Sequence, residues 1–303
     1  MLRGTLLYLS SHPGLRRWME TSSLARRLSS RFIAGNSLES ALEVCRKIRA
    51  EGITATLDYL GENVRSLDEA AACRDMYLRM LRALRDAGLE PNVSLKLTQF
   101  GLDLSPAACE QNVAMLVEEA AEMGGFVRID MEASRYTQAT LDIAMRLHER
   151  YQSCGTVIQA YLLRSEGDVA ELNRLRIRVR LCKSAYLEPL SVAFGAKESV
   201  DKNYLKLATM LLEAGEYPAL ATHDERMIEG VRRIVQQKRL PSGRFEFQML
   251  YGIRRDVQKA LIADGYRLRL YVPFGEAWYP YFMRRLAERP ANLLFLARNL
   301  LRR

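Results

Sequence analysis

A phenol, two guanidiniums and a carboxylate occur at helical spacing near the end of the sequence, in Tyr281-x-x-Arg284-Arg285-x-x-Glu288. Positions i, i+3, i+4 and i+7 share one face of an α-helix, so the spacing predicts a single surface carrying all four groups. Two adjacent arginines beside an aromatic ring can hold a small carboxylate through forked hydrogen bonds. A solvated basic helix face would give the same pattern, and the rest of the sequence decides between these interpretations.

Composition sets the broad class of the protein. The chain has 303 residues, of which 49% are hydrophobic, which is enough for one large core or two small ones. The formal net charge of +9 favours an anionic ligand or cofactor, or weak attraction to an anionic membrane surface. The basic residues are scattered and form no zinc-finger, RNP or basic-zipper pattern, so nucleic-acid binding is not indicated.

Cysteine and histidine usage indicates neither a disulfide framework nor a metal centre. The five cysteines are odd in number and form no C-x-x-C pair, which is typical of free thiols in a reducing cytoplasm. The three histidines form no H-x-x-x-H pair, so no zinc site is expected. No apolar run is long enough to span a bilayer. The first 32 residues carry six arginines and a single acid, Glu20, but no cleavage site follows an apolar core. We therefore predict an amphipathic helical arm rather than a transit peptide.

Short apolar runs alternate with longer amphipathic segments along the chain. Runs rich in β-branched and aromatic residues predict eight strands, at Ile53–Tyr59, Asn92–Leu97, Phe126–Met131, Thr156–Tyr161, Ile177–Lys183, Tyr217–Thr222, Arg244–Leu250 and Arg267–Val272. Helical periodicity, often followed by glycine, predicts helices at Leu67–Ala87, Pro106–Met123, Ala139–Tyr151, Asp201–Glu213, Glu225–Gln237 and Arg254–Ala263.

This alternation predicts an α/β fold, a (β/α)8 TIM-type barrel, because eight βα units follow one another without a linker. A doubly wound sheet for a dinucleotide would need G-x-G-x-x-G, which the sequence lacks. We expect residues 1–50 to form an N-terminal helical arm and residues 51–303 to form the barrel, as one catalytic domain overall.

Polar side chains stand at the carboxyl end of every predicted strand, where the chemistry of such barrels takes place. They are Asp58, Lys96, Asp130, Glu132, Gln159, Arg180, Lys183, Thr222, His223, Asp224, Gln248 and Tyr271. Lys96, Arg180 and Lys183, together with His223, suggest that anionic groups bind there. The Asp130 and Glu132 pair could serve a glycosidase, but nearby cations would lower both pKa values rather than keep one acid protonated.

These sequence motifs resemble the signatures of the proline dehydrogenase family in its monofunctional bacterial form. The resemblance runs from about Phe32 to Asn292, with one motif in each βα unit. The matching segments are Val93-Ser-Leu-Lys96-Leu, Val127-Arg-Ile-Asp130-Met-Glu-Ala, Val157-Ile-Gln159-Ala-Tyr, Arg180-Leu-Cys-Lys183-Ser-Ala-Tyr186, Ala221-Thr222-His223-Asp224, Phe245-Glu-Phe-Gln248-Met-Leu250-Tyr-Gly252 and Tyr281-x-x-Arg284-Arg285-x-x-Glu288. The resemblance implies an FAD enzyme that oxidises L-proline to Δ1-pyrroline-5-carboxylate and passes the electrons to a membrane quinone.

The resemblance also implies a role for individual residues. Arg284, Arg285 and Lys96 would clamp the proline carboxylate, with Glu288 orienting one arginine. The pyrrolidine ring would lie against Tyr281, Tyr271 and Leu250. Glu62 would pair with Arg284 as a gate, and Asp58 would anchor Lys96.

Another set of residues would hold the cofactor. Asp130 would lie under the flavin, and Arg180 would lie beside its reactive edge. The remaining contacts would come from Met131, Gln159, Lys183, Ser184, Ala185, Thr222 and His223. One departure from the family is Ser184, since glycine is usual there and serine adds a Cβ beside the flavin. Cys182 likewise stands where valine is common.

Two other classes of function remain open at this stage. One is a Schiff-base lyase on the same barrel, with Lys96 or Lys183 as the amine. The other is a non-catalytic binding module. For the dehydrogenase, we expect a cytoplasmic enzyme with peripheral membrane contact through its basic ends, because quinone reduction requires approach to the bilayer.

Overall fold

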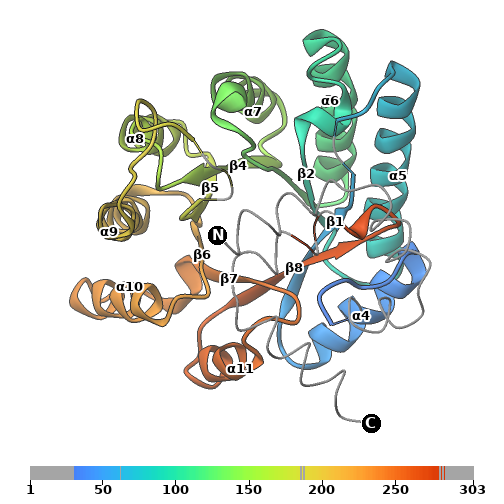
Figure 1. The fold of residues 1–303 in the computed structure, drawn as a ribbon. Helices are drawn as coiled ribbons and strands as arrows, with labels where there is room; N and C mark the ends of the chain where they lie inside the picture. The colour runs from blue at the N-terminus through green and yellow to red at the C-terminus, as the bar shows by residue number, and fades with distance from the viewer. Residues whose placement is uncertain are drawn as a thin grey trace.

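Eight parallel strands close into a barrel surrounded by helices, as predicted (Figure 1). The computed structural model describes residues 31–61, 63–184, 186, 188–279, 281 and 283. The strands are β1 (Thr54–Tyr59), β2 (Asn92–Leu95), β3 (Phe126–Ile129), β4 (Cys154–Gln159), β5 (Arg178–Cys182), β6 (Ala219–Ala221), β7 (Glu246–Leu250) and β8 (Leu268–Phe274). The barrel closes where β1 pairs with β8 over six residue pairs, from Thr54 with Arg269 to Tyr59 with Phe274.

One helix follows each of the first seven strands on the outside of the barrel (Figure 1). These helices are α5 (Leu67–Asp86), α6 (Pro106–Glu122), α7 (Thr137–Tyr151), α8 (Ser165–Arg174), α9 (Lys197–Ala214), α10 (Glu225–Gln237) and α11 (Arg255–Ala263). Helix α4 (Leu38–Ala50) precedes the barrel and packs against β1 and β8. Serine side chains cap three helices, with Ser37, Ser66 and Ser105 each accepting a bond from a main-chain N–H of the first turn.

Several observed elements differ from the predicted ones, and two of these differences have a clear local cause. The sixth strand begins at Ala219 rather than at Tyr217, because Tyr217 has a left-handed backbone (φ 43°) and Pro218 lacks an N–H for the ladder. The helix between β4 and β5 was not predicted at all. Helix α8 is only ten residues long, contains Gly167 and buries few apolar side chains, so its periodicity is weak.

The barrel interior is polar, whereas the apolar core lies between the strands and the helices. Successive side chains of a strand point to opposite faces of the sheet. In β3, Val127 and Ile129 belong to the apolar core, and the buried Arg128 between them faces the other way. The strand β7 repeats this pattern, with Phe247 in the core and Glu246 and Gln248 buried in the interior. Inward-facing polar side chains therefore connect the two ends of the barrel.

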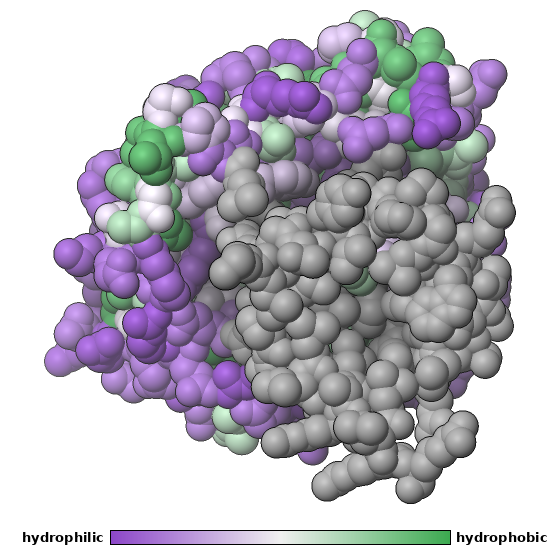
Figure 2. All heavy atoms as spheres, in the orientation of Figure 1, coloured by the Kyte–Doolittle hydropathy of each residue, from purple (hydrophilic) through white to green (hydrophobic). Residues whose placement is uncertain are grey.

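The described surface on the face shown in Figure 2 is largely hydrophilic, with small hydrophobic patches. The exposed large apolar residues are Leu67, Leu104, Met115, Leu163, Leu190 and Val192. Scattered apolar residues of this kind are normal on a protein surface. Within the described helices, none is both long enough and apolar enough to cross a membrane.

Candidate active site

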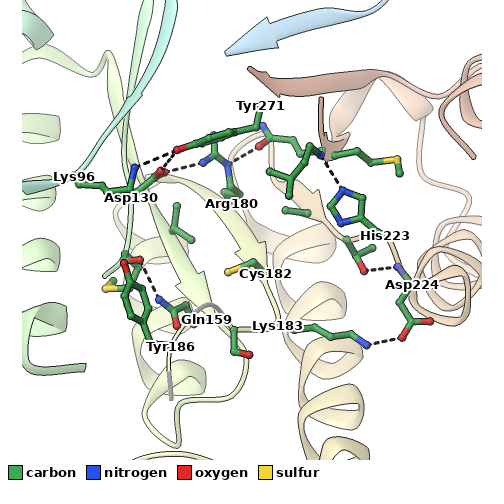
Figure 3. A pocket seen from close by; sticks show the side chains of 18 of the residues that line it. Lys96, Asp130, Gln159, Arg180, Cys182, Lys183, Tyr186, His223, Asp224 and Tyr271 are labelled. Carbon is green, nitrogen blue, oxygen red and sulfur yellow. Dashed lines mark hydrogen bonds and ion pairs between the residues drawn. The ribbon is translucent and has the colours of Figure 1, made fainter. Parts of the chain in front are cut away.

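A pocket of about 360 Å³ opens at the carboxyl ends of the strands (Figure 3). Seven of the eight strands, β2 to β8, contribute to its lining, either from the strand itself or from the residues directly after it. Fourteen residues predicted from the sequence as strand-end or binding residues line it: Lys96, Asp130, Met131, Gln159, Arg180, Lys183, Ser184, Thr222, His223, Asp224, Gln248, Leu250, Tyr271 and Tyr281. Asp58 lies beneath the pocket, completely buried, and contacts Lys96.

A continuous chain of hydrogen bonds joins the charged groups of the pocket. The Arg180 guanidinium donates from Nη1 to Oδ1 of Asp130 over 2.7 Å, and the Tyr271 hydroxyl donates to the other Asp130 oxygen over 3.0 Å. Lys96 Nζ lies 3.4 Å from the Tyr271 hydroxyl and 3.2 Å from Oδ1 of Asp58. In Figure 3, dashed lines lead from Lys96 to Tyr271, from Tyr271 to Asp130 and from Asp130 to Arg180. The cations predicted to bind anions are therefore already paired with carboxylates of the protein.

Burial changes the ionisation of two members of this chain. Burial raises the pKa of Asp58, and the nearby Lys96 ammonium opposes that change. Burial also raises the pKa of Tyr271 far above its usual value, and the adjacent Asp130 carboxylate raises it further. Tyr271 therefore remains a protonated hydroxyl that donates a hydrogen bond at neutral pH.

Arg180 is held from below by residues to which the sequence gave no role. Its Nε donates to Oε1 of Gln248 over 2.5 Å, and its Nη2 donates to the Ser94 hydroxyl over 2.8 Å. The Gln248 amide in turn donates to Oε1 of Glu246, and Glu246 accepts a further bond from Arg269 Nε over 2.9 Å. With three nitrogens engaged, two of the five N–H groups of Arg180 have no partner among the described residues. The alternation of β7, in which Glu246 and Gln248 share a face, was the sequence signal for this support.

The structure fixes the proton of His223. The main-chain N–H of Leu250 donates to its Nε2 over 2.9 Å. A ring nitrogen that accepts a hydrogen bond carries no proton, so His223 is neutral and protonated on Nδ1. The grouping of His223 with the residues expected to bind anions stays a prediction, since a neutral imidazole can still donate from Nδ1. The histidine connects β7 at Leu250 with the loop after β6.

Two aspartates surround the Lys183 ammonium. Nζ of Lys183 lies 2.5 Å from Asp201 of α9 and 2.7 Å from Asp224. Asp224 also caps α10 by accepting from the Arg226 main-chain N–H. Burial opposes ionisation of both aspartates, but hydrogen bonds from Lys183 hold both pKa values below the usual range. The predicted Lys183 side chain is thereby fixed at the rim of the pocket by two helices.

Gln159 offers an unused hydrogen-bond acceptor in the pocket. Its amide nitrogen donates to the main-chain oxygens of Met131 and Glu132 over 3.0 and 3.1 Å. Its Oε1 is buried and has no partner among the described residues. A buried acceptor without a donor is costly, so the pocket is suited to a ligand with an N–H or O–H group at this position.

Ser184 is compatible with the local backbone. It is exposed at the rim of the pocket, and its φ is not in the left-handed region. Glycine is therefore not required there for conformational reasons.

The remaining predictions divide into two groups. Glu62, Ala185, Arg284, Arg285 and Glu288 lie outside the described residues. The glycosidase alternative, which the sequence already disfavoured, is disfavoured further because only Asp130 of the two carboxylates lines the pocket. Glu132 lies beyond the end of β3, and its carboxylate accepts from the main-chain N–H and the hydroxyl of Thr98 instead.

A closed (β/α)8 barrel with charged and hydrogen-bonding groups gathered at the carboxyl ends of its strands defines a barrel enzyme. Residues 41–298 match the family model described as proline dehydrogenase. A proline dehydrogenase of Deinococcus radiodurans is 41% identical over 292 residues, covering 93% of this chain and 94% of that protein. Proline dehydrogenase 1 of Bacillus subtilis subsp. natto is 39% identical over the whole of both chains. The chain belongs to the proline dehydrogenase family, and the protein is an oxidoreductase that acts on proline.

A solved structure supports the same fold. Proline utilization A from Bdellovibrio bacteriovorus, inactivated by N-propargylglycine, has a TM-score of 0.82 and 29% identity. The match covers 87% of this chain but 33% of that longer protein.

Proposed function

We propose that the protein oxidises L-proline to Δ1-pyrroline-5-carboxylate with FAD, and that the electrons then pass to a quinone. In this reaction the C5–H hydride and the amine N–H proton leave proline as a C=N bond forms. The observation that supports FAD most directly is the buried Oε1 of Gln159, because the isoalloxazine ring carries an N–H donor for such an acceptor. When bound, the flavin supplies the hydride acceptor.

The residues of the chain would supply orientation and electrostatics. Lys96, with Arg284 and Arg285, would hold the proline carboxylate, and Glu288 would orient one arginine. Tyr271, Leu250 and Tyr281 would form the wall against the pyrrolidine ring. A carboxylate fixed in this way turns a loose encounter into a defined reaction geometry.

A second group would hold the cofactor. The unengaged N–H groups of Arg180 would donate to the flavin ring, with Asp130 fixing the guanidinium plane. Lys183, Ser184, Ala185, Thr222 and His223 would contact the ribityl chain and the phosphates. Met131 would pack beside the ring, and Glu62 and Asp58 would support the substrate side.

The Schiff-base alternative is disfavoured by the geometry. A lysine must lose its proton to attack a carbonyl group. Lys96 contacts Asp58, and Lys183 contacts both Asp201 and Asp224, so these carboxylates stabilise the charged ammonium in each case. Borohydride trapping with a carbonyl substrate would reveal a lyase.

An anaerobic visible spectrum of the FAD-supplied protein, before and after addition of L-proline, tests the proposal. Bleaching of a bound flavin by proline is the expected result. A bound flavin that does not react would retain the cofactor but reject the substrate, and absence of bound flavin would reject the FAD proposal. Quinone as the acceptor is tested by restoring the oxidised spectrum with a water-soluble quinone.

A further inference from the structure

The amino ends of the strands enclose a second cavity, which no part of the proposed reaction uses. It has a volume of about 450 Å³, and its lining includes Arg178, Tyr217, Arg267, Glu246 and Arg269. Arg178 begins β5 and Glu246 begins β7, whereas the catalytic pocket is built from the opposite ends of the strands. The two sites are therefore at opposite ends of the barrel shown in Figure 1.

Guanidiniums and aromatic rings alternate in a row that begins in the barrel and ends in the lining of this cavity, to which Arg178, Tyr217 and Arg267 belong. The guanidinium carbons of Arg128 and Arg178 lie 4.8 and 5.2 Å from the ring centre of Phe126. Those of Arg178 and Arg267 lie 5.5 and 5.7 Å from the ring centre of Tyr217. The order is Arg128, Phe126, Arg178, Tyr217 and Arg267, and we call these five residues the arginine ladder. Contact with a ring holds a flexible guanidinium in place, so the ladder presents its charges in a fixed arrangement.

Three of these guanidiniums have no carboxylate in direct contact within the described part of the chain. Arg128, Arg178 and Arg267 form no ion pair with any described carboxylate. Arg269 is different, because it pairs with both Glu246 and Glu90. The cavity lining carries three arginines and two glutamates, a formal excess of one positive charge, and the buried Arg128 of the ladder adds one more.

Arg128 shows how unusual this arrangement is. Its side chain is only 4% exposed, and its Nη1 donates to the main-chain oxygens of Thr156 and Arg178. Its Nε has no hydrogen-bond partner among the described residues. Gly155 leaves space for this side chain, because a Cβ there would lie 2.9 Å from Nη1 of Arg128. A guanidinium remains charged inside a protein, and a buried charge that is only partly hydrogen-bonded and has no ion-pair partner is costly.

We propose that this cavity binds a small oxyanion with at least two negative charges, carrying phosphate or carboxylate groups. Arg178 and Arg267 are exposed at the rim and would contact the anion through forked hydrogen bonds. The anion would supply a counter-charge in direct contact with the arginine ladder, which has no ion-pair partner among the described residues. The two glutamates of the cavity pair directly with Arg269, and Glu246 acts on Arg128 and Arg267 only at longer range.

Calorimetric titration of the FAD-saturated protein tests the site, since saturation keeps phosphate out of the proposed cofactor site. The probes are inorganic phosphate, pyrophosphate and citrate, each compared with sodium chloride at equal ionic strength. The double variant R178Q/R267Q should bind the preferred probe at least tenfold more weakly than the wild type. R79Q removes an equally exposed arginine from α5 and should change the affinity less than twofold.

The probes also distinguish the two sources of the anion. Tighter binding of phosphate and pyrophosphate indicates a phosphoryl ligand, and tighter binding of citrate indicates a polycarboxylate. No binding beyond the sodium chloride control, or equal binding by R178Q/R267Q, overturns the proposal. The single variants R178Q and R267Q provide the same comparison if the double variant does not fold. Because none of these residues lines the catalytic pocket, the result is independent of proline oxidation.

Discussion

Gln248 forms hydrogen bonds with Glu246, whose carboxylate can only accept them, and with Arg180, whose guanidinium can only donate them. Its amide nitrogen donates to the Glu246 carboxylate, so its oxygen must face the Nε–H of Arg180. This order removes the ambiguity of amide orientation, and it fixes the plane of the Arg180 guanidinium. A neutral amide thereby positions a charged group of the pocket.

We expect Q248L to lower the kcat for proline about tenfold, with a smaller change in KM. The substitution removes the hydrogen bonds to Arg180 and to Glu246, and the loss of support for Arg180 corresponds to about 1.4 kcal/mol for a tenfold effect. The absorption spectrum of the bound flavin should shift as well, because Arg180 would reorient. Q236L replaces an exposed glutamine of α10 and serves as the control. Wild-type turnover together with an unaltered spectrum in Q248L would show that Arg180 needs no such support.

The buried carboxyl group of Glu246 makes the stability of the protein depend on pH. Burial opposes its ionisation, but Arg269 holds the pKa of this carboxyl below its usual value of 4.5. A lowered pKa in the folded state stabilises the protein above pH 4.5, and this contribution is lost as the pH falls through the folded-state value. Replacing Glu246 removes the buried partner of Arg269 and leaves that guanidinium with Glu90 alone, so the cost should be at most about 3 kcal/mol.

The E246Q variant should therefore unfold at lower urea concentration than the wild type at pH 7. The difference in the free energy of unfolding between the two proteins should shrink as the pH is lowered below 4.5. Urea titrations at several pH values between 3 and 7 measure it. A difference that is constant over this range would mean that the charge of Glu246 does not contribute.

Residue identity and strand position predicted which groups reach the pocket, but not how they are paired. Lys96, Arg180 and Lys183 were correctly located because the carboxyl ends of parallel strands meet at one mouth. The pairing of Lys183 with Asp201 depends on how α9 packs beside the barrel, which is a long-range property. The tautomer of His223 likewise depends on the Leu250 N–H, 27 residues away.

At the scale of elements, helix α5 fixes the ends of two strands through Tyr77. The Tyr77 hydroxyl donates to the main-chain oxygen of Ser94 over 2.8 Å and accepts from the Tyr59 N–H over 3.3 Å. It also lies 3.4 Å from Oδ1 of Asp58. One hydroxyl therefore connects β1 and β2 directly below the Lys96 and Asp58 pair.

Y77F should lower the free energy of unfolding by about 1–2 kcal/mol, since it leaves the Ser94 oxygen and the Tyr59 N–H without this partner. Tyr204 of α9 provides a matched control. It is also completely buried, but its hydroxyl has no partner among the described residues. Y204F should therefore be neutral or slightly stabilising. Equal losses in the two variants, measured by urea unfolding, would contradict the role assigned to the Tyr77 hydroxyl.

The elements themselves were predictable wherever periodicity was strong. Helix α10 begins at Glu225 and ends at Gln237, as predicted, because Asp224 provides a cap and the apolar residues keep helical spacing. Helix α9 begins at Lys197, four residues before the predicted start, where Lys197 pairs with Asp201. Side-chain pairs of this type extend a helix beyond its apolar stripe, so the hydrophobic pattern alone misses them.

At the scale of the whole molecule, almost every strand of the barrel contributes residues to the pocket. Seven strands contribute to its lining, and pairing of β1 with β8 leaves no open edge in the sheet. A ligand in this pocket contacts groups carried by nearly all the strands at once. Its binding free energy should consequently stabilise the barrel as one unit rather than one half of it.

Saturation with FAD should raise the melting temperature of the whole barrel in a single transition. At a free FAD concentration 100 times the Kd, the added stability is about 2.7 kcal/mol, which corresponds to a shift of roughly 5–10 °C. K183M, which removes a rim cation of the pocket, should reduce the shift, whereas R79Q on the outer face of α5 should retain it. Calorimetric scans with and without FAD measure both effects. If FAD moved only one part of a divided transition, the pocket would stabilise a subset of strands and the barrel would not unfold as one unit.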